Sequence, residues 1–353
     1  MSAAVLMAAA VAVGAATWAL TGIVLGQLRR HAVFDHPNLR SSHSMPTPRG
    51  GGIAVIAVLM VAWGAFAVCF DAGSRDPAPA VLPWVIIAGI VLAVISWFDD
   101  LRGLPVALRL AAQIVAVATV LAVAPAEGPY LAGLLPPWLD ELAAGCLWLW
   151  FINAFNFMDG IDGMAGGETV AIGLGVVAVI TTAGLHDSGA GDRLAFAGAT
   201  LAAAALGFLV WNWHPAKIFL GDVGSIPLGF VTGWLLLDLA SRGQPVAALI
   251  LPLYYLSDAT LTLARRLIRG ERPWEAHRDH VYQRAVRRGL GHAAVVRRVM
   301  VANAALVVLA LMAALGWGVL AALGACLIVV ALLVNLSVSR SQHQHPFEGA
   351  NAP

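Results

Sequence analysis

Eleven long apolar runs, separated by short polar segments, constrain the fold of this chain more than any other feature. The runs cover residues 3–27, 51–70, 81–98, 106–124, 137–152, 168–185, 194–211, 226–240, 246–264, 299–316 and 318–336. A helix that crosses a bilayer needs about 20 consecutive apolar residues. With 60% hydrophobic and only 12% charged residues, a soluble protein would lack the polar surface to cover so many apolar helices. We therefore predict an all-α, polytopic membrane protein of about 11 transmembrane helices.

The arginines and the single lysine predict which loops face the cytoplasm, where basic residues are enriched. With eleven spans, 18 of these 21 residues fall in the odd-numbered loops or the C-terminal tail, and only 3 fall in the even-numbered loops. We therefore expect a periplasmic N-terminus and a cytoplasmic C-terminus. Residues 1–337 should form a single transmembrane domain, and residues 338–353 a disordered cytoplasmic tail. The expected cytoplasmic loops cover residues 28–50, 99–105, 153–167, 211–225 and 265–298.

Five aspartates lie at the ends of apolar runs that face the cytoplasm in this topology. Asp99 and Asp100 end the third run, Asp159 and Asp162 follow the fifth, and Asp222 follows the seventh. Ionisable residues in or beside membrane helices are costly and usually mark a functional site. Carboxylates that converge repel one another unless a cation is present, and hard oxygen ligands suit Mg²⁺, which is often shared with substrate phosphates. For each aspartate alone, a solvated loop residue or a helix cap is the alternative.

Neighbouring residues in these loops would suit an anionic ligand. Arg102 is the only local cation beside the Asp99–Asp100 pair. Ser225 is expected to cap the eighth helix, whose N-terminus would then favour phosphate. Lys217, the only lysine, is placed either to neutralise a diphosphate or to anchor the chain at the membrane interface.

Two further basic segments face the same side. His277 and His280 would share a face on a helix, where they could bind phosphate or sugar hydroxyls or transfer a proton. The loop around them holds ten arginines, Arg278 among them, and such a loop also attracts anionic lipid headgroups. The first loop contains His43 and Arg49 in a stretch rich in hydroxyls and glycine. It would either cradle an anionic substrate or form a positively charged hairpin.

Five segments together resemble the polyprenyl-phosphate N-acetylhexosamine-1-phosphate transferases, or glycosyltransferase family 4. That family includes undecaprenyl-phosphate N-acetylglucosamine-1-phosphate transferase and phospho-N-acetylmuramoyl-pentapeptide transferase. The matching segments, between residues 40 and 284, are RSSHSMPTPRGGG, DDLRG with downstream Arg109 and Gln113, NAFNFMDGIDG, HPAKIFLGDVGS and HRDHVYQR. The peptidoglycan enzyme has a run of adjacent histidines where this chain has HRDH. The chain looks more like members that act in surface-polysaccharide assembly.

The resemblance implies an enzyme that transfers an N-acetylhexosamine-1-phosphate from a UDP-sugar to undecaprenyl phosphate and releases UMP. The sugar would be N-acetylglucosamine or a 6-deoxy relative, and the reaction would start O-antigen or other surface-polysaccharide synthesis. The implied cofactor is Mg²⁺ or Mn²⁺. The implied location is the bacterial inner membrane, with the site on the cytoplasmic face and surrounded by membrane lipid. We expect no nucleic-acid partner, and a homodimer is one option for the assembly.

The resemblance also implies roles for individual residues. The two aspartates of DDLRG would serve the lipid-phosphate nucleophile and the metal, and the two histidines of HRDH would contact the diphosphate or the sugar. As catalytic residues we therefore expect Asp99, Asp100, His277 and His280. As metal ligands we expect Asp222 and Asp100. As substrate-binding residues we expect Asn156, Asp159 and Asp162 by matching motifs, and Lys217, Arg278, Arg49 and His43 by their charge and position.

Three other classes of protein fit the sequence less well. A secondary transporter would place its acids near the bilayer midplane on broken helices, whereas these acids lie at helix ends. A CDP-alcohol phosphotransferase needs an alanine–arginine pair after its first aspartate–glycine pair, and the stretch after Asp159 lacks it. A non-catalytic membrane scaffold would leave the clustered acids unexplained.

Overall fold

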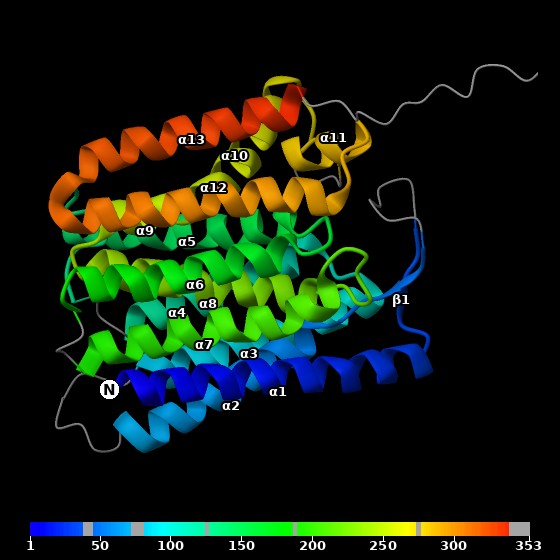
Figure 1. Cartoon of the computed structure of the whole chain (residues 1–353), viewed down its shortest axis with the longest axis horizontal. Coiled ribbons are helices and arrows are strands. Elements are labelled where there is room, and N and C mark those ends of the chain that lie inside the picture. The colour runs from blue at the N-terminus through cyan, green and yellow to red at the C-terminus, as the bar shows by residue number, and fades with distance from the viewer. Residues whose placement is uncertain (38–44, 72–80, 124–126, 186–188, 273–276, 339–353) are drawn as a thin grey trace, which may run out of the picture.

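A computed structural model describes residues 1–37, 45–71, 81–123, 127–185, 189–272 and 277–338 of the 353-residue chain. These residues are mostly helical, with almost no strand (Figure 1), so the all-α class is confirmed. The helices are α1 (Ala3–Arg30), α2 (Gly52–Phe66), α3 (Val81–Arg102), α4 (Val106–Val123), α5 (Pro137–Met158), α6 (Met164–Thr182), α7 (Gly189–Asn212), α8 (Asp222–Ser241), α9 (Pro245–Ile250), α10 (Leu253–Ile268), α11 (Val281–Arg287), α12 (His292–Met312) and α13 (Gly318–Val338). Two short strands, β1 (Phe34–Asp35) and β2 (Thr47–Pro48), pair antiparallel.

Eight helical stretches in the described part of the chain are long and apolar enough to cross a membrane. One of them is a 47-residue stretch that contains α12 and α13, which lie side by side and turn back on each other near Gly316 (Figure 1). The fifth and ninth predicted runs correspond to α5 and to the broken pair α9 and α10, which do not meet this criterion. The structure is that of a multi-pass membrane protein, and the number of spans stays a prediction.

The helices run alongside one another, and their connections gather at two ends of the bundle (Figure 1). One end, on the right of Figure 1, carries β1 and α11. The connections 103–105, 159–163 and 213–221 lie where α3, α5 and α7 end and the next helices begin. They are shorter than the predicted loops 99–105, 153–167 and 211–225, because the helices continue into them. Which side of a membrane this end faces stays a prediction.

Close packing of α5 against α8 brings polar residues of both helices together at this end. A Cβ atom at Gly233 would collide with the ring of Trp148, so glycine allows the two helices to approach closely. The Trp148 indole donates a 2.8 Å hydrogen bond to the carbonyl oxygen of Phe230. Of the described candidate spans α8 is the most deeply buried. Its first turn therefore lies in the interior, surrounded by other helix ends.

Candidate active site

The segment before α2 is bound to the connection between α7 and α8 by backbone hydrogen bonds. The amides of Gly50 and Gly51 donate to the carbonyl oxygen of Phe219 at 3.1 and 2.8 Å, and the Gly52 amide donates to that of Leu220 at 2.9 Å. A Cβ atom at Gly52 would collide with the backbone of Gly224. Only glycine permits this approach at position 52. The Gly50–Gly52 segment therefore places Arg49, the residue just before it, beside the start of α8.

Asp100 connects α3 to the start of α8. One guanidinium nitrogen of Arg49 lies 2.7 Å from Asp100 Oδ1 and 3.0 Å from Asp222 Oδ1. The Asp100 carboxylate also accepts the amides of Asp222 and Val223 at 3.1 and 2.9 Å. A carboxylate at a helix N-terminus is stabilised by the helix dipole and by the free amides. Asp100 therefore caps α8. The expectation that Ser225 does so is wrong, because α8 begins at Asp222.

Asp99 joins the same group through a second arginine. Arg109 Nη1 lies 2.8 Å from Asp99 Oδ2 and 3.6 Å from Asp222 Oδ2. The Leu104 amide donates to the other oxygen of Asp99 at 2.6 Å. Arg102, expected as the local cation, instead lies over the Phe98 ring at 5.7 Å. The counter-charges come from sequence-distant Arg49 and from Arg109 one helix later.

Asn156 and Asp159 approach this group from the end of α5. The Asn156 amide donates to Asp222 Oδ1 at 3.2 Å and to Ser225 Oγ at 2.7 Å. Burial, followed by the negative charge of Asp222, raises the pKa of Asp159 well above its ordinary value. Asp159 therefore adds a fourth carboxyl group beside Asp222.

The carboxyl groups of this group have the chemistry that a divalent metal ion prefers, whereas three ligand atoms within 4.8 Å of one another occur, among the described residues, only at Asp162, His214 and His292. Asp99, Asp100, Asp159 and Asp222 carry four carboxyl groups against the two guanidinium groups of Arg49 and Arg109. Their oxygen atoms are the ligands that Mg²⁺ and Mn²⁺ prefer. The Asp222 side chain is 20% exposed and that of Asp100 only 2%. Asp222 is therefore the more accessible of these two expected metal ligands.

Asp162 makes its hydrogen bonds elsewhere. Its carboxylate lies 2.6 Å from Nδ1 of His214 and 3.3 Å from Nδ1 of His292, and it accepts the Ala216 amide at 3.1 Å. Burial alone would raise the pKa of Asp162, but hydrogen bonds from His292 and His214 lower it below its ordinary value. These three side chains have suitable atoms for a metal ion within 4.8 Å of one another, although hydrogen bonding already explains the arrangement. Asp162 thus ties connection 159–163 to connection 213–221 and to α12.

The two histidines of HRDH lie close together, but not on one helix. His280 is the N-cap of α11, and His277 precedes it in a non-helical segment, so the expected shared helical face is wrong. Their ring centroids are nevertheless 4.9 Å apart. Burial, followed by repulsion from His280 and Arg266, lowers the pKa of His277 to about 4. Arg266 also holds the neighbouring Asp279 at 2.6 Å.

Three further residues were expected to bind substrate: Lys217, Arg278 and His43. Lys217 is exposed, with its ammonium 5.3 Å from the Trp211 ring centroid. No ion pair joins it to an aspartate among the described residues, which favours the interface-anchor interpretation. Arg278 is half-buried beside the histidines. His43 lies outside the described residues.

Several residues of this region were not assigned from the sequence. Arg109 was visible only as part of a motif, and His214 and His292 had no partner within their own segments. Asp258 carried the clearest signal, because an acid inside an apolar run usually marks function. It is fully buried in α10.

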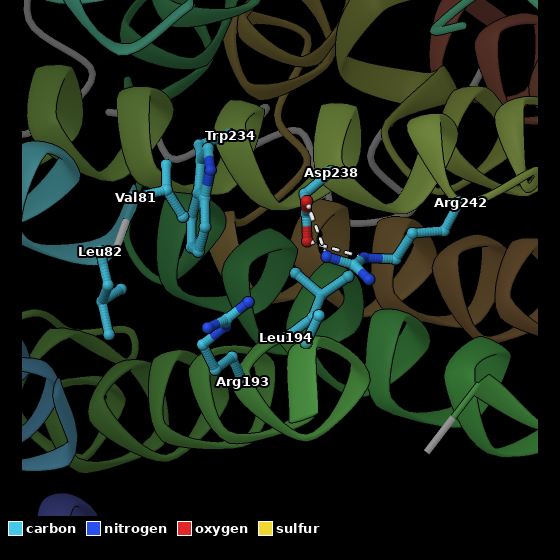
Figure 2. Close-up of a pocket in the computed structure, with 8 residues that line it drawn as sticks. Val81, Leu82, Arg193, Leu194, Trp234, Asp238 and Arg242 are labelled. Atoms are coloured by element: carbon cyan, nitrogen blue, oxygen red, sulfur yellow. Dashed lines mark hydrogen bonds and ion pairs between the residues drawn. The ribbon is translucent and has the colours of Figure 1, made fainter. Parts of the chain in front are cut away.

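A small pocket lies at the opposite end of the bundle, where α3 begins and α8 ends (Figure 2). Two of its charged residues pair with each other, since Arg242 contacts Asp238 at 3.0 Å, and Arg242 also contacts Glu127 at 2.8 Å. The pocket is lined by Val81, Leu82, Ala190, Arg193, Leu194, Trp234, Asp238 and Arg242. It is separate from the aspartate group by the length of α3.

Comparison with known proteins identifies the family. The model of glycosyl transferase family 4 matches residues 82–240. Decaprenyl-phosphate N-acetylglucosaminephosphotransferase of Mycolicibacterium smegmatis is 30% identical over 308 residues, which cover 78% of this chain and 74% of the relative. A probable undecaprenyl-phosphate N-acetylglucosaminyl 1-phosphate transferase of Bacillus subtilis is 28% identical, with 77% and 75% covered.

A third relative is undecaprenyl-phosphate alpha-N-acetylglucosaminyl 1-phosphate transferase of Salmonella typhi. It is 29% identical over 275 residues, which cover 73% of this chain and 70% of the relative. The matches extend over most of the membrane domain and include the segments that carry the aspartates. The chain therefore belongs to glycosyl transferase family 4, the polyprenyl-phosphate N-acetylhexosamine-1-phosphate transferases that its motifs resemble.

Proposed function

We propose that this protein transfers an N-acetylhexosamine-1-phosphate from a UDP-sugar to a polyprenyl phosphate, undecaprenyl phosphate in a bacterial inner membrane. An oxygen of the lipid phosphate attacks the sugar-bearing phosphorus of the donor. The bond from that phosphorus to the bridging oxygen breaks, and UMP leaves with the oxygen. The observation that carries the proposal is the convergence of Asp99, Asp100 and Asp222 around Arg49 and Arg109.

The two arginines suit a substrate that carries several phosphate charges. Guanidinium groups bind phosphate oxygens through charge-assisted hydrogen bonds. Arg49 and Arg109 each bridge Asp222 to a second carboxylate, so both are already positioned at the accessible acid. Positioning and charge stabilisation supply most of the catalysis of phosphoryl transfer. We assign both arginines to phosphate binding.

The aspartates, Asn156 and the two histidines would have the remaining roles. Asp222 and Asp100 would hold Mg²⁺ or Mn²⁺, which when bound neutralises charge that develops on the donor phosphates. Asp99, held by Arg109 and the Leu104 amide, would orient the acceptor phosphate. Asn156 fixes the orientation of Asp222 through its hydrogen bond. His277 and His280 would contact the diphosphate or the sugar.

The location of the site suits two substrates of different solubility. The aspartates lie where α3 ends and α8 begins, which is the level of lipid headgroups if these helices span the bilayer. A lipid phosphate and a water-soluble nucleotide sugar can both reach this level. A transporter is not favoured, because its acids would lie near the midplane. The cytoplasmic orientation and the homodimer stay predictions.

The donor sugar is proposed from the relatives. The three named relatives carry N-acetylglucosamine in their names, which favours UDP-N-acetylglucosamine over a 6-deoxy donor. The product would start O-antigen or another surface polysaccharide. The test combines purified protein, undecaprenyl phosphate and Mg²⁺ with a panel of UDP-N-acetyl sugars. We expect UMP release that requires the lipid, and a lipid-linked diphosphate sugar in the mass spectrum. No UMP with any donor would overturn the proposal.

A further inference from the structure

A buried carboxyl group in α10 has no part in the chemistry proposed above. Asp258 is 0% exposed and lies ten residues before the end of α10 at Ile268, or about 15 Å along the helix. An ionisable side chain at such a depth is costly to bury. Its retention therefore calls for a specific set of partners.

The Asp258 carboxylate accepts four hydrogen bonds. Two come from the first backbone amides of α11, Val281 at 2.8 Å and Tyr282 at 3.3 Å. Two come from its own helix, from the hydroxyl groups of Thr262 at 3.1 Å and Tyr254 at 3.3 Å. Four donors compensate for much of the desolvation of a carboxylate. The two amide bonds fasten the start of α11 to α10.

His280 lies at the start of α11, next to the two amides that bind Asp258. It is the N-cap of the helix and only 2% exposed. Its Nδ1 lies 3.6 Å from Asp258 Oδ1 and has no hydrogen-bond partner among the described residues. The His280 ring stacks with the rings of Phe157 and Tyr282, at centroid distances of 6.3 and 5.8 Å. A small rotation would let Nδ1–H donate to Asp258, which would fix the tautomer and leave Nε2 for a ligand.

The same helix rests on the connection that carries Asp159. The Tyr282 hydroxyl donates to the carbonyl oxygen of Phe157 at 2.9 Å. A Cβ atom at Gly160 would collide with that hydroxyl, so the helix and the connection are in direct contact. A shift of α11 would therefore move His280 and disturb the backbone beside Asp159 together.

We propose that Asp258 is a positioning residue that anchors the start of α11 and thereby holds His280 in place for the donor substrate. The role of the anchored histidine rests on the proposed function, whereas the anchoring itself does not. Asp258 touches no reacting atom and acts through His280.

The first experiment is a double-mutant cycle with Asp258→Asn and His280→Gln. Asparagine preserves the size of the side chain but removes its charge and one acceptor oxygen. We expect Asp258→Asn to lower kcat about tenfold or more with little change in the donor KM. In the His280→Gln background the same substitution should lower kcat by less than about twofold, because Asp258 acts through a histidine that is already absent. Asp238→Asn, which removes a half-buried acid at the opposite end of the bundle, should retain activity.

A purely structural role would give a different result. The losses from Asp258→Asn and His280→Gln would then multiply in the double variant, and that outcome would overturn the proposal. A substitution without effect in the wild-type background would overturn it as well.

Hydrogen exchange tests the anchoring without any need for activity. Peptides that cover residues 281–287 should exchange faster in Asp258→Asn, and peptides from α7 should not. Unchanged exchange in α11 would refute the anchor. If the wild-type protein releases no UMP from any UDP-sugar, the proposed function fails, while faster exchange in α11 would still support the anchor.

Discussion

Arg49 and Asp222, which are 173 positions apart in the sequence, are joined by a 3.0 Å hydrogen bond between guanidinium and carboxylate. The same nitrogen lies 2.7 Å from Asp100. Three segments thus meet at one cation: the stretch before α2, the end of α3 and the start of α8. This contact makes Arg49 the centre of the site.

Replacement of Arg49 should therefore be severe. Arg49→Gln removes the charge that bridges Asp100 and Asp222, and we expect kcat/KM to fall at least about a hundredfold, or about 2.7 kcal/mol. Arg49→Lys keeps the charge but loses the planar fork, and should be intermediate. Arg102→Gln is the matched control, since that guanidinium lies over Phe98. UMP release is the measurement, and equal activities of Arg49→Gln and Arg102→Gln would contradict this role.

The close approach of Gly52 to Gly224 predicts a position that tolerates no side chain. Gly52→Ala would force the segment that carries Arg49 away from α8. We expect a loss of about 1–3 kcal/mol of stability, typical of overpacking, and a loss of activity. Gly64→Ala in the same helix, where an added Cβ meets nothing within 4 Å, should be neutral or slightly stabilising. Melting temperatures in detergent compare the two, and equal values would argue against the close contact.

The ionisation of His277 predicts lower stability on mild acidification. Burial, followed by repulsion from His280 and Arg266, lowers the pKa of His277 from 6.5 to about 4. Between these values the unfolded state binds more protons than the folded state, so the free energy of unfolding falls as the pH is lowered through the window. The melting temperature of the wild type should therefore fall from about pH 7 to about pH 5, and more steeply than that of His277→Gln. Identical pH dependence of the two proteins would contradict the assigned environment.

Arginine placement and apolar run length together assign helix ends to one side, and they predict that five aspartates converge. Asp162 is the exception, because its carboxylate contacts His214 and His292 instead. Asp99, Asp100 and Asp222 could be grouped in this way. The arginine partners of these acids could not be predicted. Arg49 is brought to the site by hydrogen bonds from the backbone amides that follow it to the carbonyl oxygen of Phe219, and no local periodicity encodes such a pairing. The helix boundaries also shifted. A charged residue ends an apolar run, yet α3 continues through Asp100 to Arg102, and the Asp100 carboxylate caps α8.

The role of Asp258 could not be predicted from the sequence for a different reason. Its place within an apolar run is visible in the sequence, but the role of a buried acid depends on the groups that face it. Val281 and Tyr282 face it through their backbone amides, and an amide has no signature in the sequence. The two histidines were paired correctly in space but for the wrong reason, since His280 is the N-cap of α11 and not part of a helix with His277.

Asp99, Asp100 and Asp222 together form the proposed site of metal-dependent sugar-phosphate transfer. The most direct measurement is UMP release from UDP-N-acetylglucosamine and undecaprenyl phosphate by the wild type and by three variants, Asp99→Asn, Asp100→Asn and Asp222→Asn, over a range of Mg²⁺ concentrations. We predict Mg²⁺-dependent release by the wild type and at least about a tenfold loss in each variant, or about 1.4 kcal/mol of barrier. Asp222→Asn should also need more Mg²⁺ for half-maximal rate. Near-normal turnover by all three variants would contradict the account.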